Sequence, residues 1–304
     1  MLINRKIRLI HLHRCRGISR QKLRRLLQID PSLKNVFQLS SSQLSRYLST
    51  NQEKSELLYQ DLHNEEIIQD IYRDQKRYSI ITILDDNYPP MLKAIKDAPI
   101  VLYAAGNLSL LTSAPLLSVI GTRKPSPLAY PNMKFIVTPL VQQKWVIVSG
   151  MARGIDSYAH RLALLHKGKT IAVLGSGFHH VYPQENSMLF KHITQNGLAI
   201  SEYPPNVRPK PYHFPERNRI ISGLSFGTLV IEATEKSGTL ITVDQALDQG
   251  REVYAVPGPP YILESKGCLQ LIQDGAKLVQ TYEDIFLDWE ILKDNWYHIT
   301  GILK

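Results

Sequence analysis

Cysteine is scarce in this sequence: Cys15 and Cys268 are the only two among 304 residues. They stand far apart in the chain, and no cysteine–histidine cluster has the spacing of metal ligands. His179 and His180 also lack a carboxylate at matching spacing. We therefore exclude a disulfide-stabilised fold, expect two reduced thiols in an intracellular protein, and predict neither a metal nor a cofactor.

Complete nucleotide-binding fingerprints are missing as well. Gly175 and Gly177 begin a G-x-G-x-x-G pattern, but His180 stands where its third glycine belongs. No G-x-x-x-x-G-K-[ST] occurs anywhere in the chain. These absences argue against a nicotinamide-dependent enzyme and against an ATPase.

Long apolar runs are also absent. No stretch approaches the roughly 20 apolar residues of a membrane-spanning helix. Basic residues interrupt the apolar ones in the N-terminal MLINRKIRLIHLHRCRG, which is not the pattern of a signal peptide. We expect a soluble, cytoplasmic protein that does not bind a membrane.

Acidic residues are fewer than basic ones: 27 Asp and Glu oppose 36 Lys and Arg, for a net charge of +9. Such an excess favours polyanionic partners. Nine basic residues and no acidic one lie between Arg5 and Arg25. Within them, His13–Gln28 resembles half of a helix-hairpin-helix, whose amides can hold phosphates. A surface helix with solvated Lys22 and Arg24 explains the same residues equally well.

The apolar pattern divides the chain into a helical start and an alternating remainder. Residues 1–72 predict a small all-helical domain, and residues 73–116 a connecting extension packed on the main domain. Strands alternate with helices over 117–288, which predicts an α/β domain with a doubly wound, mainly parallel sheet. Residues 289–304 are expected to form a C-terminal tail, which is too short for a winged helix.

The segment Phe214–Gly258 contains a complete β-α-β unit. Its apolar run TLVIEA at 228–233 is typical of a covered parallel strand. Thr239–Gln249 has helical spacing, and Arg251–Val256 predicts the second strand. The loop between strand and helix lies at the carboxyl end of a strand, where open parallel sheets bind ligands.

Several predicted strands end in small residues, at 121–123, 149–150, 175–177, 201–202 and 236–238. In a parallel sheet these ends share one edge, beside helix N-termini that suit anions. Cations and aromatic rings in the same segments suit the phosphates and bases of a single strand. The donors are Arg123, Lys124, Arg153, Lys210, Arg217, Asn218, Arg219 and Lys236; the rings are Tyr130, Phe178, Tyr182, Tyr203, Tyr212 and Phe214.

Some of these side chains have a purely structural alternative. Tyr203 and Tyr212 could rigidify the proline-rich loop, and Phe178 could belong to the core. No Ser-His-Asp arrangement is supported, so nothing in the sequence demands catalysis.

Three carboxylates also lie near the strand ends. Asp156, at a predicted helix start, is interpreted as a cap rather than a catalyst. Glu202 and Glu232 could form a general acid–base pair or could order Arg217 and Arg219. We favour the ordering role.

The succession of motifs resembles the DprA family, also called Smf. The motifs are SVIGTRKPS (118–126), IVSGMARGIDSYAH (147–160), IAVLGSG (171–177), VYPQEN (181–186), SEYPP (201–205), FPERNRIISGLS (214–225) and KSGTLITVDQALDQGREVYAVPG (236–258). The resemblance implies an extended Rossmann-like domain behind a sterile-alpha-motif-like helical domain. It also implies a bacterial protein of natural transformation that protects incoming single-stranded DNA without catalysis, loads the recombinase RecA onto it and forms a homodimer.

The resemblance also indicates which residues contact DNA. Arg123 matches an arginine that contacts DNA in the family's GTR turn, and the family usually has Asp and often a basic residue where His179 and Gln184 stand. We expect amides of glycines at the strand ends to hold further phosphates. The predicted DNA-binding residues are Gly121, Thr122, Arg123, Lys124, Gly150, Arg153, Gly154, Gly175, Gly177, Phe178, Tyr182, Lys210, Arg217, Asn218, Arg219, Lys236, Ser237 and Gly238.

An enzymatic alternative remains. GLSFGTLVIEAT at 223–234 is similar to the P-G-G-x-G-T-x-x-E loop of nucleotide phosphoribohydrolases, which act on nucleoside monophosphates. Ser225 and Phe226 replace the glycines of that loop, and the spacing to the glutamate differs.

Overall fold

The computed structural model describes residues 4–113 and 115–300. The chain divides into two compact units. The smaller unit extends to Asp86 and takes in Ile100–Tyr103, and the larger unit comprises Asn87–Pro99 and the chain from Ala104 onward.

The smaller unit consists of short helices with polar side-chain caps. Its elements are α1 (Arg5–Arg14), α2 (Arg20–Ile29), η1 (Asn35–Gln38), α3 (Ser41–Tyr47), α4 (Gln52–Leu62), α5 (Glu65–Gln75) and β1 (Ser79–Thr82), together with the first residues of β2 (Val101–Gly106). Each α-helix begins after a residue whose side chain accepts a hydrogen bond from a first-turn amide. These capping residues are Asn4, Ser19, Ser40, Asn51 and Asn64.

The turn between α1 and α2 has a hairpin shape that depends on Gly17. This residue has φ +77°, and a Cβ there would lie 2.0 Å from the carbonyl oxygen of Lys54 in α4. The preceding amide, of Arg16, donates to Asp61 Oδ2 at 2.7 Å. The glycine therefore lets the hairpin pack against α4. Phosphate binding by this hairpin stays a prediction.

The larger unit alternates strands with helices. Its elements are α6 (Pro90–Lys93), η2 (Leu108–Thr112), β3 (Leu116–Ile120), α7 (Ala129–Gln142), β4 (Val146–Ser149), α8 (Ile155–Leu165), β5 (Lys169–Leu174), η3 (Phe178–His180), η4 (Gln184–Asn186), α9 (Ser187–Asn196), β6 (Leu198–Ser201), α10 (His213–Leu224), β7 (Gly227–Val230), α11 (Thr239–Asp248), β8 (Glu252–Ala255), α12 (Leu263–Gln273), β9 (Lys277–Leu278) and α13 (Glu283–Thr300). The predicted β-α-β unit is present as β7, α11 and β8.

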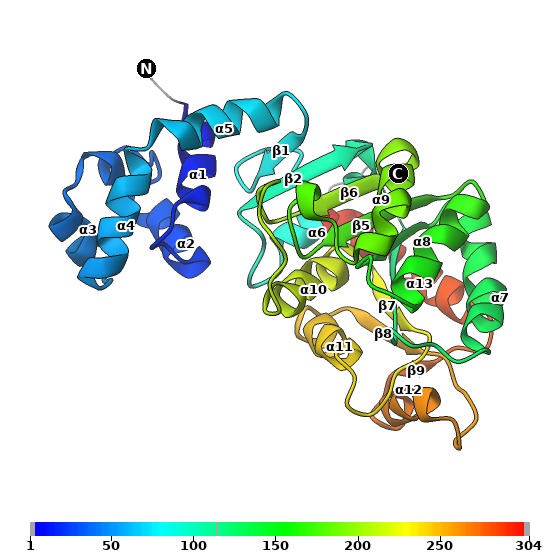
Figure 1. Ribbon diagram of the computed structural model, residues 1–304. Coiled ribbons are helices and arrows are strands. Elements are labelled where there is room, and N and C mark those ends of the chain that lie inside the picture. The colour runs from blue at the N-terminus through cyan, green and yellow to red at the C-terminus, as the bar shows by residue number, and fades with distance from the viewer. Residues whose placement is uncertain (1–3, 114, 301–304) are drawn as a thin grey trace. The chain divides into compact units, whose positions relative to one another are not determined.

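Strands of the larger unit follow the order β6-β5-β4-β3-β7-β8-β9, and every one of these pairings is parallel. The chain winds outward from β3 in one direction and from β7 in the other. Helices α7, α8 and α9 therefore cover one face of the sheet, and α10 and α11 cover the other (Figure 1). This architecture confirms the predicted doubly wound α/β fold.

The winding direction reverses between β3 and β7. In an open parallel sheet, loops on either side of such a switch point diverge and leave a crevice at the carboxyl ends of the strands. The fold thus predicts a binding site between the loops that follow β3 and β7.

Two arginines expected to contact DNA, Arg217 and Arg219, lie inside α10 and are buried. Their burial is possible because carbonyl and carboxylate oxygens of neighbouring segments accept hydrogen bonds from the two guanidinium groups.

Helix α13 continues past residue 288, through the segment expected to be a tail. Trp289 and Trp296 are buried in the same core cluster as Trp145 and Phe226. The rings of Trp289 and Phe226 meet edge to face, with centroids 5.2 Å apart. The C-terminal helix is therefore an integral part of the larger unit.

Trp289→Ala should destabilise the protein substantially because it removes a large buried aromatic side chain, at a cost of about 3–5 kcal/mol. Ile291→Ser is the matched control on the same helix. Ile291 is 75% exposed, so its replacement should change the free energy of unfolding by less than about 0.5 kcal/mol. Urea unfolding followed by tryptophan fluorescence measures both, and equal effects would show that α13 is not packed as described.

Candidate nucleic-acid interface

A hollow of about 500 Å³ occupies the switch point of the sheet. It is lined by the loop after β3, by the loop after β7, and by residues of α10, α11 and the start of α12. Among the predicted site residues it brings together Gly121, Thr122, Arg123, Lys124, Arg217, Asn218, Ser237 and Gly238.

Two further hollows extend this one along the strand ends. A small hollow of about 40 Å³ shares Arg123, Phe214 and Arg217 with the first. A third, of about 570 Å³, is lined by residues 178–182 and by η4, α9 and Pro209, and it shares Tyr182 with the small hollow. Because each hollow shares lining residues with the next, we treat the three as one feature, the strand-end trough.

The loop that carries Arg123 is held between β7 and α8. Its Thr122 amide donates to the carbonyl of Glu232 at 2.8 Å, and its Thr122 carbonyl accepts from the Ile155 amide at 3.2 Å. Gly154 packs against the same loop with φ +71°, where a Cβ would lie 2.4 Å from Thr122 O. Contacts with the segment after β7 and with the start of α8 therefore fix the backbone position of Arg123.

Glu232 fixes the far end of this loop. Its carboxylate accepts hydrogen bonds from the amide of Ser126, at 2.8 Å, and from the Ser126 hydroxyl. The carboxylate is buried at the end of β7. The interpretation that Glu232 orders Arg217 is therefore wrong, because Ser126 occupies its carboxylate.

Arg217 forms the floor of the trough. Its guanidinium donates to the carbonyl oxygens of Gly150 and Val173, and it forms no ion pair with any residue that the structure describes. A Cβ at Gly150 would lie 2.6 Å from this guanidinium, so the close approach requires glycine. Burial and then the like charge of Arg123 lower the pKa of Arg217 to about 10, although Asp156 opposes this shift. The group therefore remains positive at neutral pH.

Asp156 supports the loop beside this arginine. Its carboxylate accepts from the amides of Gly150 and Ala152 at 3.2 and 3.3 Å, both in the loop before α8. The interpretation of Asp156 as a helix cap is therefore wrong, because the N-cap of α8 is Gly154 and Asp156 orders the preceding loop instead. Burial raises the pKa of Asp156, while Arg217 and these amides act in the opposite direction.

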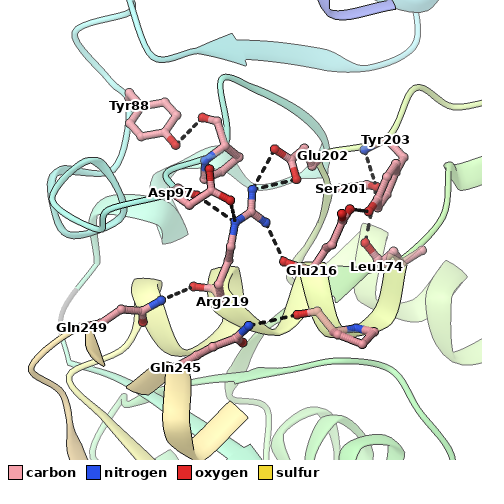
Figure 2. A network of polar contacts seen from close by, with 12 residues as sticks. Tyr88, Asp97, Leu174, Ser201, Glu202, Tyr203, Glu216, Arg219, Gln245 and Gln249 are labelled. Atoms are coloured by element: carbon pink, nitrogen blue, oxygen red, sulfur yellow. Dashed lines mark hydrogen bonds and ion pairs between the residues drawn. The ribbon is translucent and has the colours of Figure 1, made fainter. Parts of the chain in front are cut away.

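Arg219 is a structural residue rather than part of the trough. Figure 2 shows its guanidinium held by both carboxylate oxygens of Glu202, at 2.9 Å, and by Asp97. It is 5% exposed and does not line any of the three hollows. The ordering role of Glu202 is thereby confirmed for Arg219.

The exposed cations are distributed unevenly. Arg123 and Lys124 line the trough, and among the described residues neither has an ion-pair partner. Arg153 also lines it, but donates two hydrogen bonds to Glu185 at 3.0 and 2.9 Å. Lys210 and Lys236 are exposed outside the lining, and the Lys210 ammonium lies 5.8 Å from the centre of the Tyr212 ring.

Two of the predicted phosphate-binding amides are already used within the protein. The Gly150 amide donates to Asp156, and the Gly177 amide donates to Val207 O at 2.8 Å. Gly175 and Gly177 serve close packing instead, because a Cβ would meet the Phe214 ring at 3.0 Å and Pro204 O at 2.1 Å. The expectation that the Gly150 and Gly177 amides hold phosphates is therefore wrong.

Aromatic rings of the trough have different roles. Tyr182 is half exposed, and its ring centroid lies 5.4 Å from that of Phe214. Phe178 is buried, with its ring centroid 5.7 Å from that of Phe190. Tyr203 stacks on His213 and donates to Glu216 at 2.8 Å, which agrees with the structural alternative for it.

Sequence reasoning missed the aliphatic part of the trough. Ile241 of α11 and Leu263 of α12 line the hollow at the switch point, although both look like ordinary core positions of helices. No group of three or more histidine, cysteine or acidic side chains within the described ranges could hold a metal ion. Likewise, no helix in residues 4–113 or 115–300 is both long and apolar enough to cross a membrane.

Comparison with known proteins agrees with the motifs. The family model of DNA recombination-mediator protein A matches residues 79–290. DNA processing protein DprA of Bacillus subtilis is 45% identical over 215 residues, which cover 71% of this chain and 72% of the relative. DprA of Streptococcus pneumoniae is 43% identical over 218 residues, which cover 72% and 77%.

Solved structures are similar too. The X-ray structure of Streptococcus pneumoniae DprA has a TM-score of 0.83 and 36% identity, covering 94% of this chain and 98% of that one. DprA of Helicobacter pylori, whose structure describes a unique single-stranded DNA binding mode of that protein, has a TM-score of 0.63 and 29% identity, covering 72% and 97%. The resemblance inferred from the motifs is confirmed, and this chain belongs to the family of DNA recombination-mediator protein A, the DprA and Smf proteins.

Proposed function

We propose that this protein binds single-stranded DNA along the strand-end trough, protects it, and loads RecA onto it in natural transformation. One observation carries the proposal: the small hollow of the trough, next to the switch point, is lined by Arg123, Arg217, Tyr182 and Phe214. Cations suit phosphates, and exposed rings suit unstacked bases. Membership of a recombination-mediator family and the single-stranded DNA binding of the Helicobacter pylori relative support it.

The proposed activity is binding without catalysis. A phosphoribohydrolase would need a carboxylate available at the end of β7, but that of Glu232 is occupied by Ser126. Ser225, which stands where the hydrolase loop has glycine, is buried and hydrogen-bonded to Ser118 at 2.8 Å. Release of free base from nucleoside monophosphates would favour the enzyme instead.

RecA as partner, a homodimer formed through the Rossmann-like domain and a cytoplasmic location belong to the same proposal. They rest on family membership and on the general charge balance. The domain division at residues 72 and 116 is likewise proposed from sequence. Light scattering of the full-length protein measures the oligomeric state, and a strand-exchange assay started on coated single strands measures RecA loading.

Arg123→Ala should weaken binding to single strands of any sequence, because a cation without an ion-pair partner is removed from the trough. The slope of log affinity against log salt should fall by about 0.7 for each phosphate that the variant no longer neutralises. A filter-binding or anisotropy series over salt concentrations measures it. Lys134→Ala is the control, since Lys134 is exposed on α7 and lines none of the three hollows. Equal losses of affinity in the two variants would contradict the proposed role of the trough.

Glu185→Gln should have the opposite effect. It removes the carboxylate that occupies Arg153 and a negative charge beside the trough, so single-strand affinity should rise about two- to fivefold at low salt. Glu290→Gln removes a similar exposed carboxylate, paired with Lys293 outside the trough, and should change little. Unchanged affinity of Glu185→Gln would mean that Arg153 does not contact the strand.

A further inference from the structure

The switch-point hollow of the strand-end trough has an apolar part as well as a cationic part. Ile241 and Leu263 both line it, and they are 40% and 57% exposed. They come from different helices, α11 and α12, while Arg123 and Lys124 come from the loop after β3. Single exposed aliphatic side chains are ordinary on protein surfaces, but two that converge on one charged hollow need a physical account.

The chemistry of the occupant follows from the whole lining. Three positive side chains, those of Arg123, Lys124 and Arg217, outnumber the two carboxylates of the lining, Asp156 and Glu264, and favour an anionic ligand. The aliphatic pair calls for an apolar surface on that same ligand. An unstacked single strand offers both, since its phosphates are charged and the faces of its bases are free. A duplex offers its phosphates and the edges of its bases, but stacking hides the faces of its bases.

We propose that Ile241 and Leu263 form a base-contacting wall, which packs against the faces of unstacked nucleobases while Arg123 and Lys124 hold the phosphates of the same strand. This inference rests on the proposed function and deepens it, because it names the part of the ligand that each side of the hollow recognises. It also assigns the preference for single strands over duplex to this wall.

The space around the wall permits such contacts. At Gly238, which lines the hollow together with Ile241, no atom lies within 4 Å of a would-be Cβ, so the approach to α11 is open. Thr242, the neighbour of Ile241, is buried and also lines the hollow. Ile241 therefore belongs to a packed helix, while its own side chain stays accessible to a ligand.

The test compares two ligands that differ only in their bases. Full-length protein is titrated with an oligothymidylate and with an abasic deoxyribose-phosphate strand of equal length, each over a series of salt concentrations. Leu263→Ser and Ile241→Ser should each weaken oligothymidylate binding about three- to tenfold. Binding of the abasic strand and the salt slope of both ligands should not change, because the phosphate contacts are intact. Duplex affinity should also stay the same.

Leu247→Ser is the matched control. Leu247 lies on α11, is 60% exposed and lines none of the three hollows. This variant should bind both ligands as the unaltered protein does, and the melting temperatures of all three variants should agree.

Other outcomes would overturn the inference. An equal loss on the abasic strand would mean that the wall does not contact bases, and no loss on either strand would mean that it contacts no DNA. Unchanged strand binding with loss of binding to RecA would assign the wall to a protein partner. Failure of the unaltered protein to bind any single strand would instead refute the proposed function itself.

Discussion

A buried guanidinium that is hydrogen-bonded to two carbonyl oxygens underlies the whole trough. Arg217 donates to the carbonyls of Gly150 and Val173, and so ties α10 to the carboxyl ends of β4 and β5. A buried charge costs free energy; the nearby carboxylate of Asp156 lowers that cost, and the like charge of Arg123 raises it. An anion in the hollow would offset the repulsion between the two arginines, so the packing of the fold itself favours anions there.

The glycines at the strand ends serve this arrangement by their size. Gly150 leaves room for the guanidinium of Arg217, Gly154 leaves room for the Arg123 loop, and Gly177 leaves room for the proline-rich loop. With Glu232 holding Ser126, the loops are set before any ligand arrives. Prepositioned groups lose less conformational entropy when a ligand binds, which favours affinity without further contacts.

The position of the trough explains why a polymer suits it better than a single cofactor. Three hollows share lining residues along the strand ends, with Tyr182 between the last two. Cations, an aromatic pair and two aliphatic side chains together line that course. A strand of nucleotides repeats charge and ring in the same way, so one protein surface can contact several units at once.

The sequence by itself determined the fold class, the switch-point loops and the family, because hydrophobic periodicity and short motifs are local properties of the chain. It also indicated Arg123, Lys124, Arg217 and Tyr182 as residues of the site. Only the tertiary structure separated Arg217 in the trough from Arg219, two residues away, which Glu202 and Asp97 hold. It likewise assigned Glu232 to Ser126 and brought Ile241 and Leu263 to the hollow. Partners of buried charges and exposure of helix faces depend on segments distant in sequence, which no local pattern records.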